Sequence, residues 1–239
     1  MILVVTEGAR DEPALIKILV DHGFYGDKTE IVSYGTNIHC LIGQLREYDW
    51  NKSDELDISM VLREVDRMTN GGKGVDLLSG KFSDVLLIFD LDPQDGNFDL
   101  DDISWLVSCF SKDTTEGKLF LNYPMFDVLF YSKGRKVDLA ELSKKGWFKE
   151  KAHQSIWWRK FSKARGSLQG SQSLAANFSR KDVHDLLKEH RTRFLDITGR
   201  DYCNATMVDL FERQKELIVN QKKVYCINTS VLSILDFSS

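Results

Sequence analysis

Three carboxylates follow two apolar, β-branched stretches that have the composition of buried strands. Glu7 lies just beyond residues 2–5, after Thr6, while Asp90 closes residues 84–90 and Asp92 lies two positions beyond it. Residues i and i+2 of a strand share a face, so this spacing predicts that Asp90 and Asp92 point to one place. Clustered carboxylates repel one another, and a hard divalent cation relieves that repulsion. The pattern predicts a Mg²⁺ site, with Mn²⁺ as an alternative metal, that binds phosphate and activates water.

The elements that must position these side chains alternate along the first half of the chain. We expect strands at 2–5, 29–34, 84–90 and 118–121, helices at 11–22, 38–48, 54–68 and 99–111, and a loop at 69–83. Asp11 is expected to cap the first helix, with Pro13 in its first turn. The alternation predicts an α/β fold with a mainly parallel sheet flanked by helices, whose functional crevice lies at the carboxyl ends of the strands.

The second half of the chain has a different pattern and a different charge. Helix-like stretches at 137–163, 180–194 and 205–220 dominate it, and one late strand is expected at 224–227. Residues 1–130 carry 11 Lys/Arg against 24 Asp/Glu, whereas residues 131–239 carry 21 against 12. We therefore expect a catalytic domain at 1–131, followed by a basic, mostly helical region at 132–239 that binds a substrate or a partner.

Basic and aromatic residues interleave early in the second half. Residues 131–165 hold 11 Lys/Arg and three acids, and they include Trp147, Trp157, Trp158, Arg159, Lys160, Lys163 and Arg165. Phosphate attraction combined with stacking is typical of proteins that hold flexible nucleic acid. Buried tryptophans on an amphipathic helix are the alternative, and for the aromatic residues it is favoured. Candidate substrate contacts are Lys136, Arg159, Lys160 and Lys163, and Lys133 or Lys136 is a candidate to stabilise a transition-state phosphate.

The run Glu7-Gly8-Ala9-Arg10-Asp11-Glu12 and the later Asp90-Leu91-Asp92 resemble the TOPRIM domain of topoisomerases, primases and several nucleases. The resemblance covers about residues 1–131. It implies a compact α/β fold with a glutamate and an Asp-x-Asp pair around Mg²⁺. It assigns Glu7 as a metal or acid–base residue, and Asp90 and Asp92 as metal ligands. Asp11 matches an extra acidic position of the nuclease branches.

The segment Asn122-Tyr123-Pro124-Met125-Phe126-Asp127 narrows the resemblance. It is similar to the Asn-x-Pro-x-Phe-Glu stretch of the RloB-like and PARIS-type anti-phage effectors, which like the OLD-family nucleases contain TOPRIM domains. Asp127 stands where those proteins usually carry Glu. The resemblance implies a Mg²⁺-dependent endonuclease that cuts cellular nucleic acid, with tRNA as one candidate, and a separate ATPase that restrains it. The chain has no GxxxxGK[ST] loop, so ATP hydrolysis would belong to that partner.

Other functions remain open from the sequence. A stand-alone RNA-maturing or DNA-repair TOPRIM nuclease and a non-catalytic TOPRIM binding module are the alternatives, and homo-oligomers are compatible with each. The late position of Asp90 disfavours a haloacid-dehalogenase nucleophile, and Asp99, Asp101 and Asp102 suit a helix N-terminus better than a metal site.

No apolar run approaches the roughly 18 residues of a membrane span. The basic start of a secretory signal is missing and the four cysteines are scattered, so we expect a cytoplasmic protein with reduced thiols.

Overall fold

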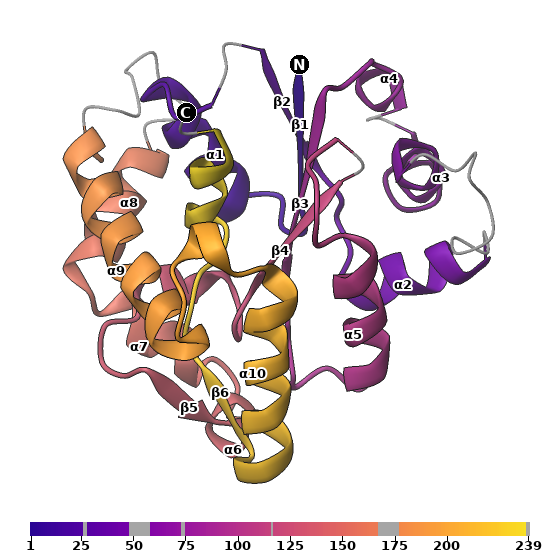
Figure 1. Cartoon of the computed structure of the whole chain (residues 1–239). Coiled ribbons are helices and arrows are strands. Elements are labelled where there is room, and N and C mark those ends of the chain that lie inside the picture. The colour runs from indigo at the N-terminus through magenta and orange to yellow at the C-terminus, as the bar shows by residue number, and fades with distance from the viewer. Residues whose placement is uncertain (26–27, 48–57, 73–74, 116, 167–176, 238–239) are drawn as a thin grey trace.

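A computed structural model of the chain describes residues 1–25, 28–47, 58–72, 75–115, 117–166 and 177–237. Its centre is a four-stranded parallel sheet in the order β2-β1-β3-β4 (Figure 1). The strands are β1 (Ile2–Thr6), β2 (Thr29–Ser33), β3 (Asp84–Asp90) and β4 (Lys118–Asn122). The predicted α/β class and the parallel sheet are therefore confirmed.

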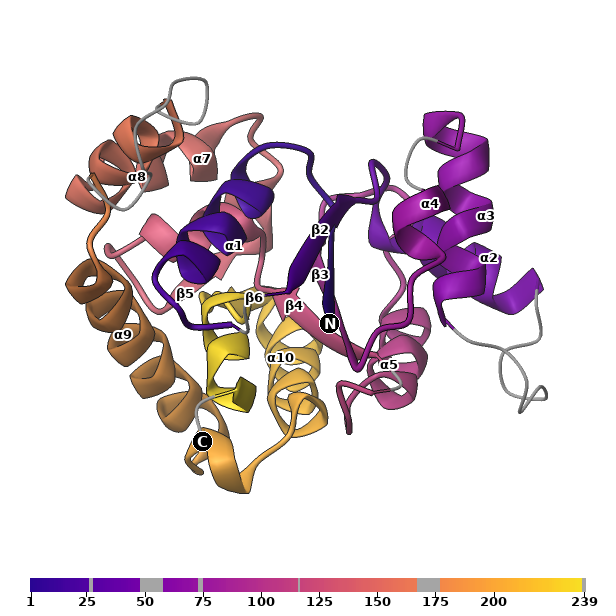
Figure 2. The same cartoon turned by 90° about the horizontal axis from the view of Figure 1, so that it is seen from above.

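Helices cover both faces of this sheet, and all of its strands run in one direction. Helix α1 (Asp11–Asp21) lies on one face, while α2 (Ile38–Glu47), α3 (Ile58–Asn70), α4 (Val75–Leu78) and α5 (Leu100–Cys109) lie on the other (Figures 1 and 2). The short helix α4 corrects the expectation of a loop throughout 69–83. The first four residues of the helix predicted at 54–68 lie outside the described residues.

The second half is mostly helical, as predicted, but its elements are shorter than the stretch 137–163 indicated. In place of one long helix, the structure has α6 (Leu139–Leu142), α7 (Trp147–His153) and α8 (Ile156–Gly166), the last of which runs past residue 163. Helices α9 (Arg180–Thr198) and α10 (Met207–Gln221) follow. Gly146 separates α6 from α7 in a left-handed conformation, with a φ of 74°, that favours glycine. An antiparallel ribbon joins β5 (Lys136–Asp138) to β6 (Lys223–Tyr225).

Strand register brings the predicted acids to one edge of the sheet. Thr6 at the end of β1 pairs with Ile88 of β3, and the Glu7 backbone amide donates to the Ile88 carbonyl at 2.9 Å. Every residue from Val85 to Phe89 is buried, because β3 lies between two strands and beneath helices on both faces. Glu7 and Asp90 therefore both leave the buried sheet at its carboxyl end, as the strand assignments predicted.

An ion pair, a hydrogen bond and a β-bridge join the two halves of the chain. Lys118 of β4 forms an ion pair with Asp236 at 2.7 Å, and His22 after α1 hydrogen-bonds the Phe178 carbonyl at 2.7 Å. A β-bridge joins Tyr123 to Ile227. The division at residue 131 stays a prediction, because these contacts run across it.

Within the described residues, no helix is both long and apolar enough to cross a membrane.

The buried centre of β3 gives a prediction about stability. Leu87 is fully buried between β1 and β4, so Leu87→Ala should lower the free energy of unfolding by about 2–5 kcal/mol through lost contacts and a cavity. Leu195→Ala on the exposed part of α9 should change it by no more than about 0.5 kcal/mol. Urea unfolding followed by circular dichroism measures both, and similar losses in the two variants would contradict this description of the core.

Candidate active site

The centre of the candidate site is a contact between the ends of β1 and β3. The backbone amide of Asp90 donates to Oε2 of Glu7 at 3.1 Å. The Asp90 carboxylate in turn accepts a hydrogen bond from Nδ2 of Asn122 at 3.1 Å and one from the backbone amide of Phe126. These bonds hold the two acids in place, so Glu7 and Asp90 lie together as the sequence predicted.

Burial and mutual repulsion raise the pKa of both acids. The pKa of Glu7 rises from 4.5 to about 8, chiefly because the carboxyl is buried, although the Asp90 amide opposes the shift and the charge of Asp92 adds to it. The pKa of Asp90 is also raised well above its ordinary value, first by burial and then by the charges of Glu7 and Glu12. At neutral pH the site therefore holds protons that isolated carboxyl groups would have lost.

Asp92 joins this group by a different route from the one predicted. Strand β3 ends at Asp90, and Asp92 has a left-handed φ of 42°, so the expectation of a shared strand face is wrong. Its amide donates to the Pro124 carbonyl at 3.1 Å, and its Oδ1 accepts from Gln94 at 2.9 Å. Burial raises the pKa of Asp92. A turn, not the alternation of a strand, brings Asp92 to the site.

Glu12 is an acid of the site to which the sequence pattern assigned no role. It lies in the first turn of α1, is 9% exposed, and has its pKa raised chiefly by burial. Its carboxylate packs against the backbone of Gly8, where a Cβ atom would lie 2.8 Å from Oε1 of Glu12. A side chain at position 8 would therefore displace the Glu12 carboxylate from this place. The signal was present in the run from Glu7 to Glu12, but the sequence does not say which way Glu12 points.

The far end of the chain supports the site through Asn122. The Asn122 side chain is fully buried, and its Oδ1 accepts from the backbone amides of Thr229 and Ser230 at 3.2 and 3.3 Å and from the Ser230 hydroxyl at 2.8 Å. Its amide nitrogen is thereby aimed at Asp90. Asn122 thus links the C-terminal segment to the acidic group, which consists of Glu7, Glu12, Asp90 and Asp92. No local pattern in residues 228–231 indicated this role.

Asp127 is bound by a histidine that the sequence left without a partner. Nε2 of His153 lies 2.6 Å from Oδ1 of Asp127, which is 7% exposed. The His153 ring stacks on Trp158, with ring centroids 3.4 Å apart and an angle of 5° between the planes. Asp127 interacts electrostatically with Glu12 and Asp92, so this pair borders the acidic group. Because 26 positions separate the two partners, spacing in the sequence could not reveal the pair.

Asp11 is also bound by a basic residue of the second half. It forms an ion pair with Arg165 of α8, and Nε of Arg10 lies 3.8 Å from its Oδ1. The expectation that Asp11 caps α1 is wrong, because Arg10 occupies the cap position and Asp11 is the first helical residue. The Arg165 guanidinium also lies 5.3 Å from the centre of the Trp158 ring, so Trp158 contacts the basic partners of both Asp11 and Asp127.

The predicted substrate-binding lysines are dispersed. Nζ of Lys133 donates to Gln154 at 2.7 Å, beside the histidine that binds Asp127. Lys136 lies on the β5–β6 ribbon, with its Nζ 4.7 Å from the centre of the Tyr225 ring. The structure thus places Lys133 near the border of the acidic group, whereas Lys136 packs on an aromatic ring of the ribbon.

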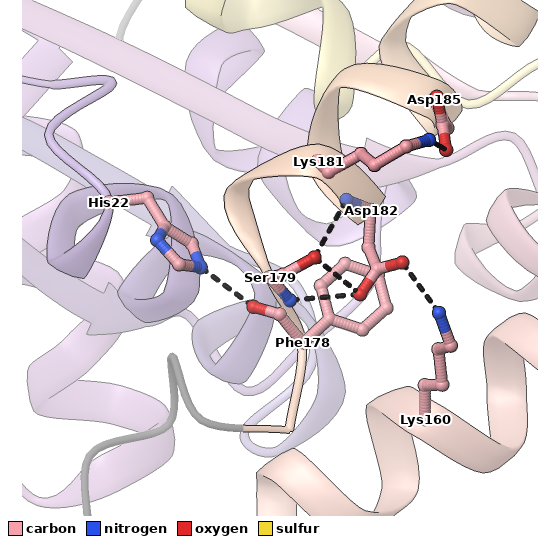
Figure 3. A network of polar contacts seen from close by, with 7 residues as sticks. All are labelled: His22, Lys160, Phe178, Ser179, Lys181, Asp182 and Asp185. Carbon is pink, nitrogen blue, oxygen red and sulfur yellow. Dashed lines mark hydrogen bonds and ion pairs between the residues drawn. The ribbon is translucent and has the colours of Figure 1, made fainter.

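Lys160 of α8 has a structural partner. Its Nζ lies 2.6 Å from Oδ1 of Asp182, whose other oxygen accepts from Ser179 in the capping box of α9 (Figure 3). The ammonium group also lies 5.2 Å from the centre of the Trp157 ring. Lys160 therefore joins α8 to the start of α9, whereas Arg159 and Lys163 on the same helix are exposed.

The donor chemistry of the site fits a hard cation, but its present geometry is not that of a formed metal centre. Glu7, Glu12, Asp90 and Asp92 provide only carboxylate oxygens, which Mg²⁺ prefers. Among the described residues, however, no group of three or more His, Cys, Asp or Glu side chains is arranged to hold a metal ion. The oxygens of the acidic group must converge further before they can hold one ion.

Comparisons with known proteins give no independent assignment. No protein-family model, curated protein or solved structure matches this chain significantly. The interpretation of the site therefore depends on its own residues and their geometry.

The raised pKa of Glu7 predicts how stability depends on pH. Without divalent cations, the melting temperature should fall as the pH rises from about 5 to 8, because the folded state keeps a proton that the unfolded carboxyl releases near pH 4.5. The loss has an upper limit of about 1.4 kcal/mol per pH unit for this group. Glu7→Gln should flatten the dependence, whereas Glu216→Gln on the exposed surface of α10 should not. An unchanged slope in Glu7→Gln would assign the proton to another group.

Proposed function

We propose that this chain is a Mg²⁺-dependent nuclease that hydrolyses phosphodiester bonds. The observation that carries the proposal is the group of acids at the carboxyl edge of the parallel sheet, with Glu7 bonded to the Asp90 amide. Keeping several carboxyl groups in one partly buried place destabilises the fold, and such perturbed groups are typical of functional sites. The edge of the sheet is also where ligands bind in α/β proteins.

The residues of the chain have separate roles in this proposal. A bound Mg²⁺ ion would polarise the phosphate oxygens and lower the pKa of water. Glu7, Asp90 and Asp92 are the residues that would hold it, and their oxygens must first converge. Asn122 orients Asp90 through its hydrogen bond. Glu7, whose pKa is raised to about 8 without metal, would accept a proton from the attacking water only in its ionised form, so this role favours pH values near 8 and above.

Nucleic acid is the proposed substrate class because basic side chains of the second half approach the acidic edge. Arg165 reaches Asp11, and His153 reaches Asp127. Exposed Arg159 and Lys163 extend the basic surface along α8. The order of Glu7, Asp90 and Asp92 resembles that of TOPRIM nucleases, and this resemblance is the support for an anti-phage role, for tRNA as a substrate and for a restraining ATPase.

One observation favours a second candidate function. The described residues contain no preformed metal-holding group, which suits a non-catalytic module that binds nucleic acid or a protein partner. The raised pKa values of Glu7 and Asp90 favour the nuclease, because a binding module has no need of buried, repelling acids. Cleavage assays distinguish the two candidates.

The proposed nuclease predicts cleavage that depends on the metal and on two acids. Mixed tRNA or plasmid DNA should be cut with Mg²⁺ or Mn²⁺ and left intact with EDTA. Glu7→Gln and Asp90→Asn should each lower the cleavage rate at least about a hundredfold, because one removes a proton acceptor and the other a metal ligand. Asp113→Asn is the matched control, since Asp113 lies on the exposed loop at the opposite end of the sheet.

Thermal melts must accompany these assays. Both variants replace a buried, ionisable carboxyl by a neutral amide, so they should fold at least as stably as the wild type, most clearly at pH values where the carboxyl would ionise. Full cleavage by either variant would contradict the proposed mechanism. Binding of nucleic acid without cleavage of RNA or DNA, in protein that also binds Mg²⁺, would favour the non-catalytic module.

A further inference from the structure

A pocket of about 450 Å³ lies beside the turn that joins β1 to α1. Three cationic side chains line it, from Arg10 before α1, Lys17 within α1 and Arg165 at the end of α8. Its apolar lining includes Pro13, Ala14 and Ile31. The pocket therefore combines positive charge with an apolar surface, as a site for a phosphate group and its attached sugar or base requires.

Asp11 contacts two of the three cations of this pocket. Its carboxylate forms an ion pair with Arg165, whose side chain is only 16% exposed, and lies 3.8 Å from Nε of Arg10, whose side chain is 73% exposed. The Asp11 carboxylate thus lies near both guanidinium groups and holds chiefly that of Arg165. Lys17 is 3.4 Å from Asp21 in an exposed pair, which contributes little to stability. The three cations outnumber the two acids that they contact, so the pocket keeps an excess of positive charge.

The pocket and the acidic group share the turn between β1 and α1. Glu7 and Gly8, the first residues of the turn, belong to the acidic site: Glu7 accepts from the Asp90 amide, and Glu12 packs on Gly8. Ala9 and Arg10, the next two residues, line the pocket. A nucleic-acid strand that is cut at Glu7 and Asp90 would therefore pass close to the cationic side chains of the pocket, because the same turn carries both.

We infer that this pocket binds a phosphate group of a single nucleic-acid strand, next to the phosphodiester bond that the acidic group cleaves. The inference rests on the proposed nuclease function and deepens it by naming a substrate subsite. Guanidinium groups bind phosphate oxygens through charge-assisted hydrogen bonds, and the apolar lining suits the adjoining ribose or base. Asp11 accordingly serves the arginines, and not a second metal ion.

Binding measured without cleavage tests this subsite. The probes are fluorescently labelled oligouridylate and oligothymidylate, titrated in EDTA and followed by anisotropy. The double variant Arg10→Ala/Lys17→Ala should weaken binding about tenfold or more at moderate salt, and should reduce the log–log salt slope by about 1.4 for two lost single-strand contacts. The matched control, Lys81→Ala/Arg213→Ala, removes the same charge from exposed positions outside the pocket and should bind almost as the wild type does. Arg10 and Lys17 are exposed, so melting temperatures should stay unchanged in both.

Each outcome decides the inference separately from the proposed function. Selective loss of binding in the Arg10/Lys17 variant supports the subsite, even if the wild type cleaves no substrate and the nuclease proposal fails. Equal binding by both double variants overturns the subsite, even if the wild type cleaves nucleic acid. Wild-type protein that binds neither probe at low salt overturns it as well. Displacement of the probes by equimolar uridine monophosphate would show a mononucleotide pocket and overturn the assignment to a strand.

Discussion

The burial of several carboxyl groups beside one another is the constraint on which the rest of this structure depends. The parallel sheet ends with Glu7 and Asp90 side by side, and the turns that follow bring Glu12 and Asp92 to the same edge. The fold accommodates them by keeping protons on the inner acids, as the raised pKa values of Glu7 and Asp90 indicate. We propose that an edge of this kind exchanges protons for a divalent cation.

The outer acids are stabilised in another way, by basic side chains from the second half of the chain. Arg165 binds Asp11 and His153 binds Asp127, and both basic groups pack on Trp158. The helices α7 and α8 are thus joined to the acidic edge at two points. This arrangement connects the charge asymmetry of the sequence to the structure, because part of the positive surplus compensates the acidic half, and part is left at the surface and in the pocket beside Arg10.

The parts of the fold and of the site that depend on local pattern were predictable. The continuous apolar run before Asp90 identified β3, and the strand before Glu7 identified β1, so their shared edge followed from parallel pairing. Asp99 does cap α5, as its sequence context favoured. The metal site, the nuclease activity and the domain division remain predictions.

What the sequence could not indicate depends on contacts between distant residues or on backbone turns. The left-handed turn at Asp92 breaks the two-residue alternation of a strand. The partners of Asp127 and Asp11 lie 26 and 154 positions away. The structural packing of Trp158 against Phe130 and Phe161 agrees with the alternative that the sequence favoured for the aromatic residues, but the pairing of Lys160 with Asp182 was not indicated. Charge counts cannot separate such internal ion pairs from cations that meet a ligand.

Titration calorimetry with Mg²⁺ tests the central claim, that the acidic edge holds a divalent cation, most directly. The wild type should bind Mg²⁺ and release protons near pH 8, where Glu7 is partly protonated. The variant Asp90→Asn/Asp92→Asn, which removes two charges while nearly preserving shape, should lose most of this affinity and of the Mg²⁺-dependent rise in melting temperature. Equal Mg²⁺ affinity in the wild type and in this variant would contradict the account and place the cation elsewhere.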